Sequence, residues 1–282
     1  MSQLYTINHP SITLELAIAE ISTLHIHEEI IPSFMEALRK KISEDGVFVH
    51  PIIVDKETRV VLDGMHRVAA SKALSFQHIP VCFVDYNNPH ILLRCWYRTF
   101  RDLEAEEIEE AMRLLGLKYE SMDLDSAQRM VKDRKKEIAL LTKAGAYAVD
   151  DHSDAEVIYA NVKRMEKEFS RSHVMGFASE REAKEKVLRG ELSACIATPA
   201  LSKDEVTVVA KAGRVYPQKT TRHVIPARPM GVRVPTQWLV TSLSEGVLNE
   251  RLRAHLSSMT LRPMPPGTVL DRLYEEPLYV FE

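Results

Sequence analysis

The fold of the first part of this chain is decided by the stretch Val60-Val61-Leu62-Asp63-Gly64-Met65-His66-Arg67-Val68-Ala69-Ala70. Its first three residues are apolar and two of them are β-branched, which predicts a short buried strand. Asp63-Gly64 predicts a tight turn, because glycine tolerates turn geometry and aspartate hydrogen-bonds within its own turn. Residues 66–74 contain no glycine or proline and predict a helix.

A helix that begins with His66-Arg67 brings free backbone N–H groups and cationic side chains to one point. Such a point binds anions, and phosphate is the usual occupant. The alternative is a strand–turn–helix corner in which Arg67 only pairs with a surface carboxylate. Spacing alone leaves both interpretations open.

Length and composition limit the class of protein. A chain of 282 residues with 45% hydrophobic content can bury a full core in one or two domains. The net charge of -3 argues against a general DNA-coating protein. The three cysteines form no metal-binding spacing and favour a reduced, cytoplasmic setting. No apolar run approaches the roughly 18 residues of a membrane span, and no secretory signal is visible.

Residues 1–100 form the first expected domain. Ser33-x-x-Glu36 predicts a capped helix that ends near Gly46. The runs at residues 52–54 and 60–62 flank a turn and predict a hairpin or a short crossover. Further strands are expected at residues 12–16 and 79–84.

Residues 101–282 form the second expected domain, an α+β domain with a helical middle. Three helices are expected between residues 98 and 169, the second of them with an apolar face from Ala127 to Leu141. The charged run at residues 132–136 favours a solvated helix face over a nucleic-acid patch, because an acid interrupts it. Further helices are capped by Ser179-x-x-Glu182, Ser202-x-x-Glu205 and Ser242-x-x-Glu245, and strands are expected at residues 174–178, 192–196 and 278–281.

A second chemical stretch lies within this domain. Lys219-Thr220-Thr221-Arg222-His223 concentrates phosphate donors in five positions. A glycine-rich Walker loop is absent from the sequence, which excludes a P-loop protein. The alternative is an exposed polar turn before a strand at residues 224–225.

The turn at residues 63–67 resembles the nucleotide-phosphate signature of the ParB/sulfiredoxin-like superfamily, and His50-Pro51-Ile52-Ile53-Val54 resembles the strand that precedes it. Met65 stands where sulfiredoxin has its catalytic cysteine. A thioether has no thiolate form, so sulfiredoxin chemistry is excluded. Together with the stretch at residues 219–223, the turn resembles the free L-serine kinase family.

The resemblance implies transfer of a phosphoryl group from ATP or ADP to the hydroxyl of free L-serine, which gives O-phospho-L-serine. It implies a cleft between an N-terminal ParB/sulfiredoxin-like domain and a C-terminal α+β domain. The residues from Arg272-Leu273-Tyr274 to Val280-Phe281-Glu282 resemble the ending of the bacterial, siderophore-associated members more than that of the archaeal ones.

The same resemblance implies roles for individual residues. Glu28 would be the general base, with Glu29 as the rival, and His27 and Trp96 would contact the serine. Asp63 would hold Mg²⁺, although its alternative role is to close the turn, and Trp96 could equally be a core residue. The nucleotide phosphates would be bound by Gly64, Met65, His66, Arg67, Lys219, Thr220, Thr221, Arg222 and His223.

Two other classes stay open at this point. A nucleotide-controlled DNA-binding switch of the ParB type predicts a helix-turn-helix and a basic face after the first domain. A regulator that binds nucleotide without catalysis is the third option. The kinase interpretation needs neither nucleic acid nor a membrane as a partner. The donor nucleotide, the pathway served and the oligomeric state, for which a homodimer is one option, have no readable motif.

Overall fold

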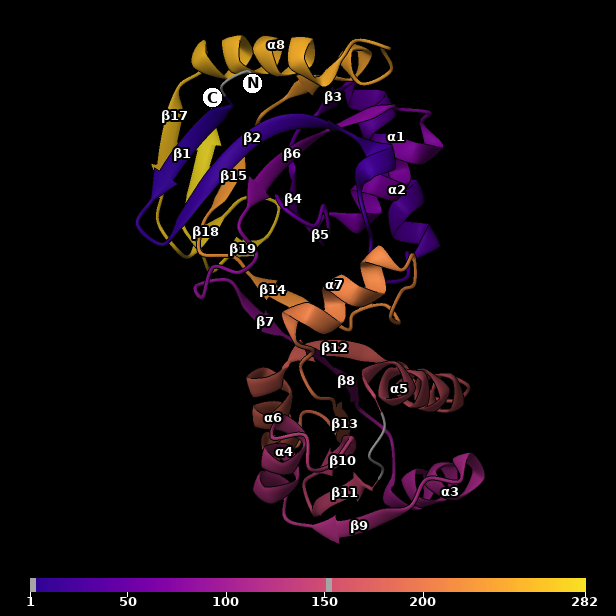
Figure 1. The fold of residues 1–282 in the computed structure, drawn as a ribbon. Helices are drawn as coiled ribbons and strands as arrows, with labels where there is room; N and C mark the ends of the chain where they lie inside the picture. Colours follow the sequence, from indigo (N-terminus) through magenta and orange to yellow (C-terminus); the bar gives the residue numbers. More distant parts are fainter. Residues whose placement is uncertain (1–3, 151–153) are drawn as a thin grey trace. The chain divides into compact units, whose positions relative to one another are not determined.

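The computed structural model describes residues 4–150 and 154–282, and the chain divides into two compact units (Figure 1). Unit 1 comprises Met1–Leu92, Val206–Val215 and His223–Glu282, and unit 2 comprises Leu93–Glu205 and Tyr216–Arg222. This division differs from the expected single boundary near residue 100, because the C-terminal segment belongs to unit 1.

Unit 1 is built around a five-stranded sheet. In spatial order its strands are β1 (Tyr5–His9), β2 (Ile12–Glu20), β6 (His78–Val84), β4 (Ile52–Asp55) and β5 (Val61–Asp63). β4 and β6 are parallel, and the other neighbours are antiparallel. β4 and β5 therefore form the expected hairpin. β6 is buried along its whole length, as a central strand covered on both faces must be.

Among the described residues, three α-helices lie wholly in unit 1, namely α1 (Pro32–Asp45), α2 (Met65–Ala73) and α8 (Glu245–Ser257). α1 and α2 pack against each other, whereas α8 lies along β1 and β2 (Figure 1). α1 begins with a proline at its first position and has no side-chain cap, so the capping box expected at Ser33 is wrong.

The C-terminal segment has a sheet of its own and is tied to β2 by a buried side chain of α8. A second sheet has the order β15 (Arg228–Met230), β20 (Leu278–Phe281) and β17 (Leu261–Met264). The amide of Asn249 on α8 accepts from the N–H of Ile18 at 2.6 Å and donates to its carbonyl at 3.3 Å. Partners so far apart in sequence leave no local pattern, which is why the expected boundary differs.

Short elements complete unit 1. They are η1 (Ile21–Thr23), β3 (Val47–Phe48), β16 (Val234–Pro235), η2 (Thr236–Trp238), β18 (Thr268–Val269) and β19 (Leu273–Tyr274). The chain changes unit within β7 (Leu92–Arg94), α7 (Lys203–Lys211) and β14 (Arg222–Val224). Among the described residues, no helix is long and apolar enough to cross a bilayer.

Unit 2 is a six-stranded antiparallel sheet with helices on it. Its strands in spatial order are β12 (Gly176–Ser179), β8 (Trp96–Phe100), β13 (Ala194–Ala197), β10 (Ile138–Thr142), β11 (Gly145–Val149) and β9 (Tyr119–Met122). The helices are α3 (Ala105–Leu115), α4 (Leu124–Lys132), α5 (Ala155–Phe169) and α6 (Glu180–Arg189). α4 and α6 cover one face of the sheet, where their alanine and valine side chains pack on Tyr97, Leu141 and Cys195.

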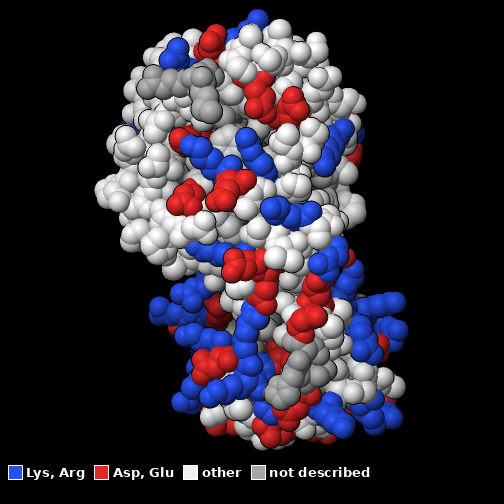
Figure 2. Space-filling model, viewed as in Figure 1, with Lys and Arg blue, Asp and Glu red and all other residues white. Residues whose placement is uncertain are grey.

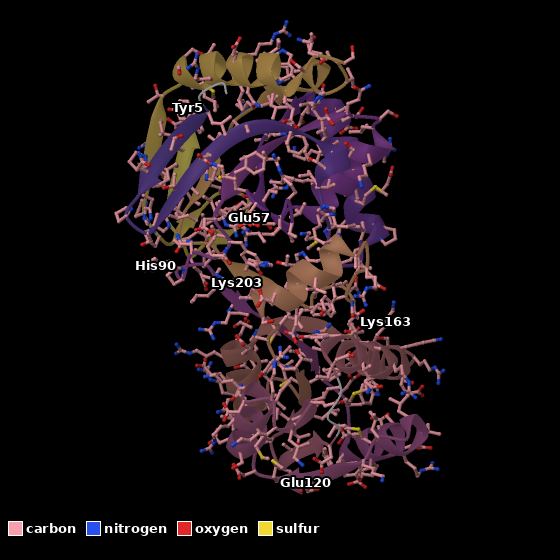
Figure 3. The ribbon with its side chains drawn as sticks, viewed as in Figure 1. Tyr5, Glu57, His90, Glu120, Lys163 and Lys203 are labelled. Atoms are coloured by element: carbon pink, nitrogen blue, oxygen red, sulfur yellow. The ribbon has the colours of Figure 1, made fainter. Side chains whose placement is uncertain are left out.

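The helical middle expected for this part of the chain is only half right. Ile138 to Leu141 was expected on a helix but forms the buried strand β10. The charged run before it stops α4 at Lys132, because Arg134 adopts the left-handed conformation with φ of 54°. The run is also no solvated helix face. Arg134 pairs with Glu205 at 2.6 Å, and the buried Lys136 pairs with Asp150 and with Glu120 of the edge strand β9 (Figure 3).

The strand, turn and helix expected around Gly64 are confirmed. β5 ends at Asp63, Gly64 has φ of 97°, and α2 begins at Met65. A Cβ at position 64 would lie 2.5 Å from the Cγ2 of Ile52 and 2.9 Å from a guanidinium nitrogen of Arg67. Glycine is therefore required here both by backbone conformation and by the close approach of β4.

We predict that Gly64→Ala lowers the free energy of unfolding of unit 1 by about 2–4 kcal/mol, since it adds a clash to the left-handed strain. Gly46→Ala is the matched control, because Gly46 has φ of 64° with nothing within 4 Å of its Cβ position. It should cost about 1 kcal/mol. Urea titration followed by Trp238 fluorescence in a Trp96→Phe background reports on unit 1. Equal losses for the two variants would mean that the contact with Ile52 is not restrictive.

Candidate active-site clusters

In unit 1, the loop at residues 24–31 is fixed at both ends to the strand–turn–helix corner. The N–H of His25 donates to the carbonyl of Arg59 at 3.0 Å, and the N–H of Val61 donates to the carbonyl of His25 at 2.9 Å. At the other end, the N–H of Ile31 donates to Nε2 of His66 at 3.0 Å. The loop that carries Glu28 and Glu29 is therefore held in place by the stretch predicted to bind phosphate.

This loop presents a buried polar pair. His27 is fully buried and Glu28 is only 7% exposed. The rings of His27 and His223 lie 5.4 Å apart edge to face, and Nε2 of His223 is 2.8 Å from the hydroxyl of Tyr86. The structure thus brings together His27, Glu28 and His223, all predicted as site residues from the sequence, and it adds Tyr86, which no motif indicated.

Burial determines the charge of the histidines in unit 1. It lowers the pKa of His27 to about 4, and a backbone hydrogen bond with Val61 opposes this only in part. Burial and the nearby guanidinium of Arg67 lower the pKa of His50 to about 4 as well. Nδ1 of His50 accepts the N–H of Gly231 at 3.1 Å, which also requires the neutral ring. Both imidazoles are therefore neutral at pH 7.

The metal site expected at Asp63 stays a prediction, and the carboxylate of Asp63 is already paired with two arginines. Its Oδ2 accepts from Arg67 at 3.0 Å and from Arg228 at 2.8 Å. Partial burial would raise its pKa, but Arg228, Arg67 and Arg272 outweigh this effect and hold the pKa below the usual range. The described residues also contain no group of three His, Cys, Asp or Glu residues that could hold a metal ion. Asp63 is thus an ion-pair centre between two arginines.

Arg67 is engaged as fully as Asp63. Its second terminal nitrogen donates to the carbonyls of His50 and Pro51, both at 2.8 Å. Gly64 supplies no capping side chain to α2, so the N-terminus of this helix, with Met65 and His66 in its first turn, is suited to an anion. The expected anion site at residues 64–66 therefore depends on backbone groups more than on Arg67.

In unit 2, Trp96 is flanked by two cations. Nζ of Lys219 and Cζ of Arg222 lie 5.5 and 5.6 Å from its ring centroid. The backbone of Lys219 has φ of 59°, and the hydroxyl of the fully buried Thr220 donates to Pro217 at 2.8 Å. Thr220 therefore closes the turn that presents Lys219 and Arg222, and Thr221 beside it is 8% exposed.

The turn is held by Arg98, a residue that no motif indicated. Arg98 is fully buried on β8, and its Nε donates to Glu166 of α5 at 2.5 Å. Its terminal nitrogens donate to the carbonyl of Trp96 at 2.9 Å, to that of Lys219 at 3.3 Å and to that of Gln218 at 3.2 Å. One guanidinium thus ties the strand of Trp96 to the turn of Lys219.

Arg222 retains unused donors. Its Nε is buried and has no hydrogen-bond partner among the described residues. Its terminal nitrogen lies 3.8 Å from Oε2 of Glu180, too far for a hydrogen bond. A buried N–H without an acceptor is costly, and a bound anion would satisfy it.

The predicted site residues therefore form one cluster in each unit. Unit 1 holds His27, Glu28, residues 63–67 and His223, and unit 2 holds Trp96 and residues 219–222. Whether the two clusters share one cleft stays a prediction.

No family model matches the chain. The chain is 27% identical over 235 residues to an ATP-dependent L-serine kinase of Staphylothermus marinus, which covers 79% of this chain and 90% of the relative. It is 23% identical over 235 residues to the ADP-dependent L-serine kinase SerK of Thermococcus kodakarensis, covering 82% and 95%. A ParB-like protein of Sulfolobus acidocaldarius is 28% identical over 215 residues, covering 76% and 93%.

Solved structures give the same fold. A free serine kinase in complex with AMP superposes with a TM-score of 0.66 at 23% identity, covering 79% of this chain and 93% of the other. SbnI from Staphylococcus aureus gives 0.70 at 18% identity, covering 86% and 96%. The mixed α+β fold is thus that of the free serine kinase and SbnI structures. The expected closer similarity to bacterial members is not confirmed, because the kinase relatives above are archaeal.

We predict that unit 1 loses stability as the pH falls from 6.5 to 4. Over this range the unfolded chain protonates His27 while the folded chain keeps it neutral, which alone costs roughly 3 kcal/mol. His50, whose pKa is lowered in the same direction, adds to the loss. In His27→Gln the slope of stability against pH should decrease by about one proton, whereas in His90→Gln, at an exposed position (Figure 3), it should not change. Urea titrations at several pH values, read from Trp238, measure this slope. An unchanged slope in His27→Gln would refute the assignment.

Proposed function

We propose that this chain is a free L-serine kinase that transfers a phosphoryl group from ATP or ADP to the serine hydroxyl and releases O-phospho-L-serine. Its similarity to L-serine kinases extends over about four fifths of its length. One observation supports the proposal at the level of residues. The buried Nε–H of Arg222, next to Trp96, has no acceptor among the described residues. An anionic ligand on an aromatic platform would satisfy it.

Glu28 is the proposed general base. In the reaction the serine oxygen attacks the terminal phosphorus of the nucleotide, its proton passes to the carboxylate, and the bond from phosphorus to the leaving phosphate oxygen breaks. Burial of Glu28 and the hydrogen bonds that fix its loop favour a defined position for this carboxylate. Glu29 remains the rival base, and neutral His27 would orient the serine.

Phosphate binding is the proposed role of the first turn of α2 together with Lys219 and Arg222. Phosphoryl transfer depends mainly on positioning and on neutralising charge, which these groups supply. His66 accepts a backbone N–H from the Glu28 loop, so we assign it a positioning role as well. A magnesium ion would have to be held by the nucleotide phosphates and other residues, because Asp63 is paired with two arginines. A cytoplasmic location accompanies the proposal.

The kinase proposal is favoured over a ParB-type switch by the middle of the chain. Such a switch needs two consecutive helices as a helix-turn-helix. In the described part of residues 103–169, β9 separates α3 from α4, and β10 and β11 separate α4 from α5. The visible face of unit 2 also mixes Lys and Arg with Asp and Glu rather than forming one basic surface (Figure 2).

We predict that Glu28→Gln lowers kcat for phosphoserine formation by roughly 10²–10⁴-fold, because an amide cannot take the proton from serine. The Kd for nucleotide should hardly change. The measurement is phosphoserine formation with Mg²⁺ and ATP or ADP, beside nucleotide titration. Glu29→Gln is the matched control and should retain activity. If Glu28→Gln turns over normally and Glu29→Gln loses activity, the general base is Glu29. If the wild type forms no phosphoserine, the kinase proposal is overturned.

We also predict that Arg222→Lys lowers kcat/KM roughly 10- to 100-fold, because lysine keeps the charge but loses the planar fork of donors. The thermal midpoint should stay within the range of the control Arg189→Lys, an exposed position at the end of α6. Steady-state kinetics with both variants test this expectation. If Arg222→Lys has the kcat/KM of the wild type, residues 219–222 form only a structural turn and do not bind the substrate.

A further inference from the structure

A carboxylate that no motif indicated lies beside the Trp96 cluster of unit 2. Ser179, the last residue of β12, is the register partner of Trp96 on β8, and Glu180 is the first residue of α6. Oε1 of Glu180 lies 3.6 Å from Sγ of Cys95, and Oε2 lies 3.8 Å from Arg222. Glu180 is therefore positioned between the interior of the unit and the cation predicted to bind an anion.

Further acceptors gather around the same sulfur atom. The carbonyl oxygen of Thr198 lies 3.2 Å from Sγ of Cys95. The hydroxyl of Thr198 is buried and has no hydrogen-bond partner in the part of the chain that the structure describes. Burial and the neighbouring Glu180 raise the pKa of Cys95 to about 12, so Cys95 stays a thiol and offers only a weak donor. The carboxylate of Glu180 and the carbonyl of Thr198 thus both lie close to this sulfur atom, and the hydroxyl of Thr198 can still take a further partner.

Glu180 and Thr198 also line a groove of about 790 Å³ in unit 2, together with residues of α4 and α6. The other acids of this groove are already neutralised. Asp125 pairs with Lys184, and Glu185 pairs with Arg181 at 2.7 Å. Among the described residues, the only ion pair of Glu180 is the distant one with Arg222, and its Oε2 has no hydrogen bond there. Its carboxylate is the acid of the groove with spare capacity for a cationic ligand.

We infer that Glu180, with the oxygens of Thr198, binds the α-ammonium group of the amino-acid substrate; this rests on the proposed kinase function. An ammonium group has three donors in fixed directions and needs acceptors that include a negative charge when it leaves water. Arg222, on the other side of Glu180, then faces the carboxylate or the phosphoryl group. A zwitterion is thereby recognised at both charges, and a hydroxy acid without the amino group is rejected because Glu180 would stay unpaired.

Glu180→Gln tests this assignment, because it keeps the size of the side chain and removes its charge. Serine binding is measured by calorimetry, and phosphorylation is measured for serine and for 3-hydroxypropanoate, which lacks only the amino group. We expect Kd and KM for serine to rise roughly 10- to 100-fold with nucleotide affinity unchanged. For 3-hydroxypropanoate the rate should stay the same or increase. Glu182→Gln, two residues further along α6 and paired with Lys186, is the matched control and should behave as the wild type.

The alternative role of Glu180 is to orient Arg222. In that case Glu180→Gln lowers the rate of phosphorylation of serine and of 3-hydroxypropanoate by the same factor. This equal loss overturns the inference. Unchanged serine affinity in Glu180→Gln overturns it as well. If the wild type binds serine without phosphorylating it, the kinase proposal fails while a weaker Kd in Glu180→Gln still supports the ammonium site. If the wild type binds no serine at all, both proposals fail.

Discussion

The ion pairs at Asp63 are the interaction on which unit 1 depends. One carboxylate accepts from Arg67 of the same turn and from Arg228 of the C-terminal segment, and Arg228 also pairs with Glu276. Arg228 is only 9% exposed at its side chain, and a buried guanidinium without carboxylates would cost several kcal/mol. The turn predicted to bind phosphate therefore keeps its shape only when the segment that carries Arg228 and Glu276 is in place.

Unit 2 also fixes a turn through one buried charged side chain, but here the central group is a cation and its partners are acceptors. Arg98 supplies one buried cation, and the carboxylate of Glu166 and three carbonyl groups surround it. A hydrogen-bonded centre of this kind fixes a loop more rigidly than apolar packing does, because each bond has a required direction. The consequence is that Lys219 and Arg222 are presented on a rigid turn rather than on a mobile surface loop.

Local patterns explain why part of the architecture was predictable. The strand, turn and helix at Gly64, the caps at Ser179 and Ser202 and the final strand depend on neighbours in sequence. The expected helix across Ile138 failed, because burial in a central strand produces an apolar run that periodicity cannot separate from a helix. Candidate site residues could be named from the sequence where motifs carry chemistry, and their roles stay predictions. Arg98, Arg228 and Glu180 were missed, because each acts through partners distant in sequence.

The division of unit 1 among three separate segments has a consequence for synthesis on the ribosome. β20, the last strand of the chain, lies between β15 and β17 in its sheet. Until β20 leaves the ribosome, those two strands have no partner between them, and until Glu276 emerges Arg228 lacks that ion pair. Unit 2 ends at Arg222, so all of its residues emerge earlier. The nascent chain would thus fold unit 2 first, while unit 1 is still incomplete and exposes unpaired strand edges. Chaperones protect chains in this state from aggregation.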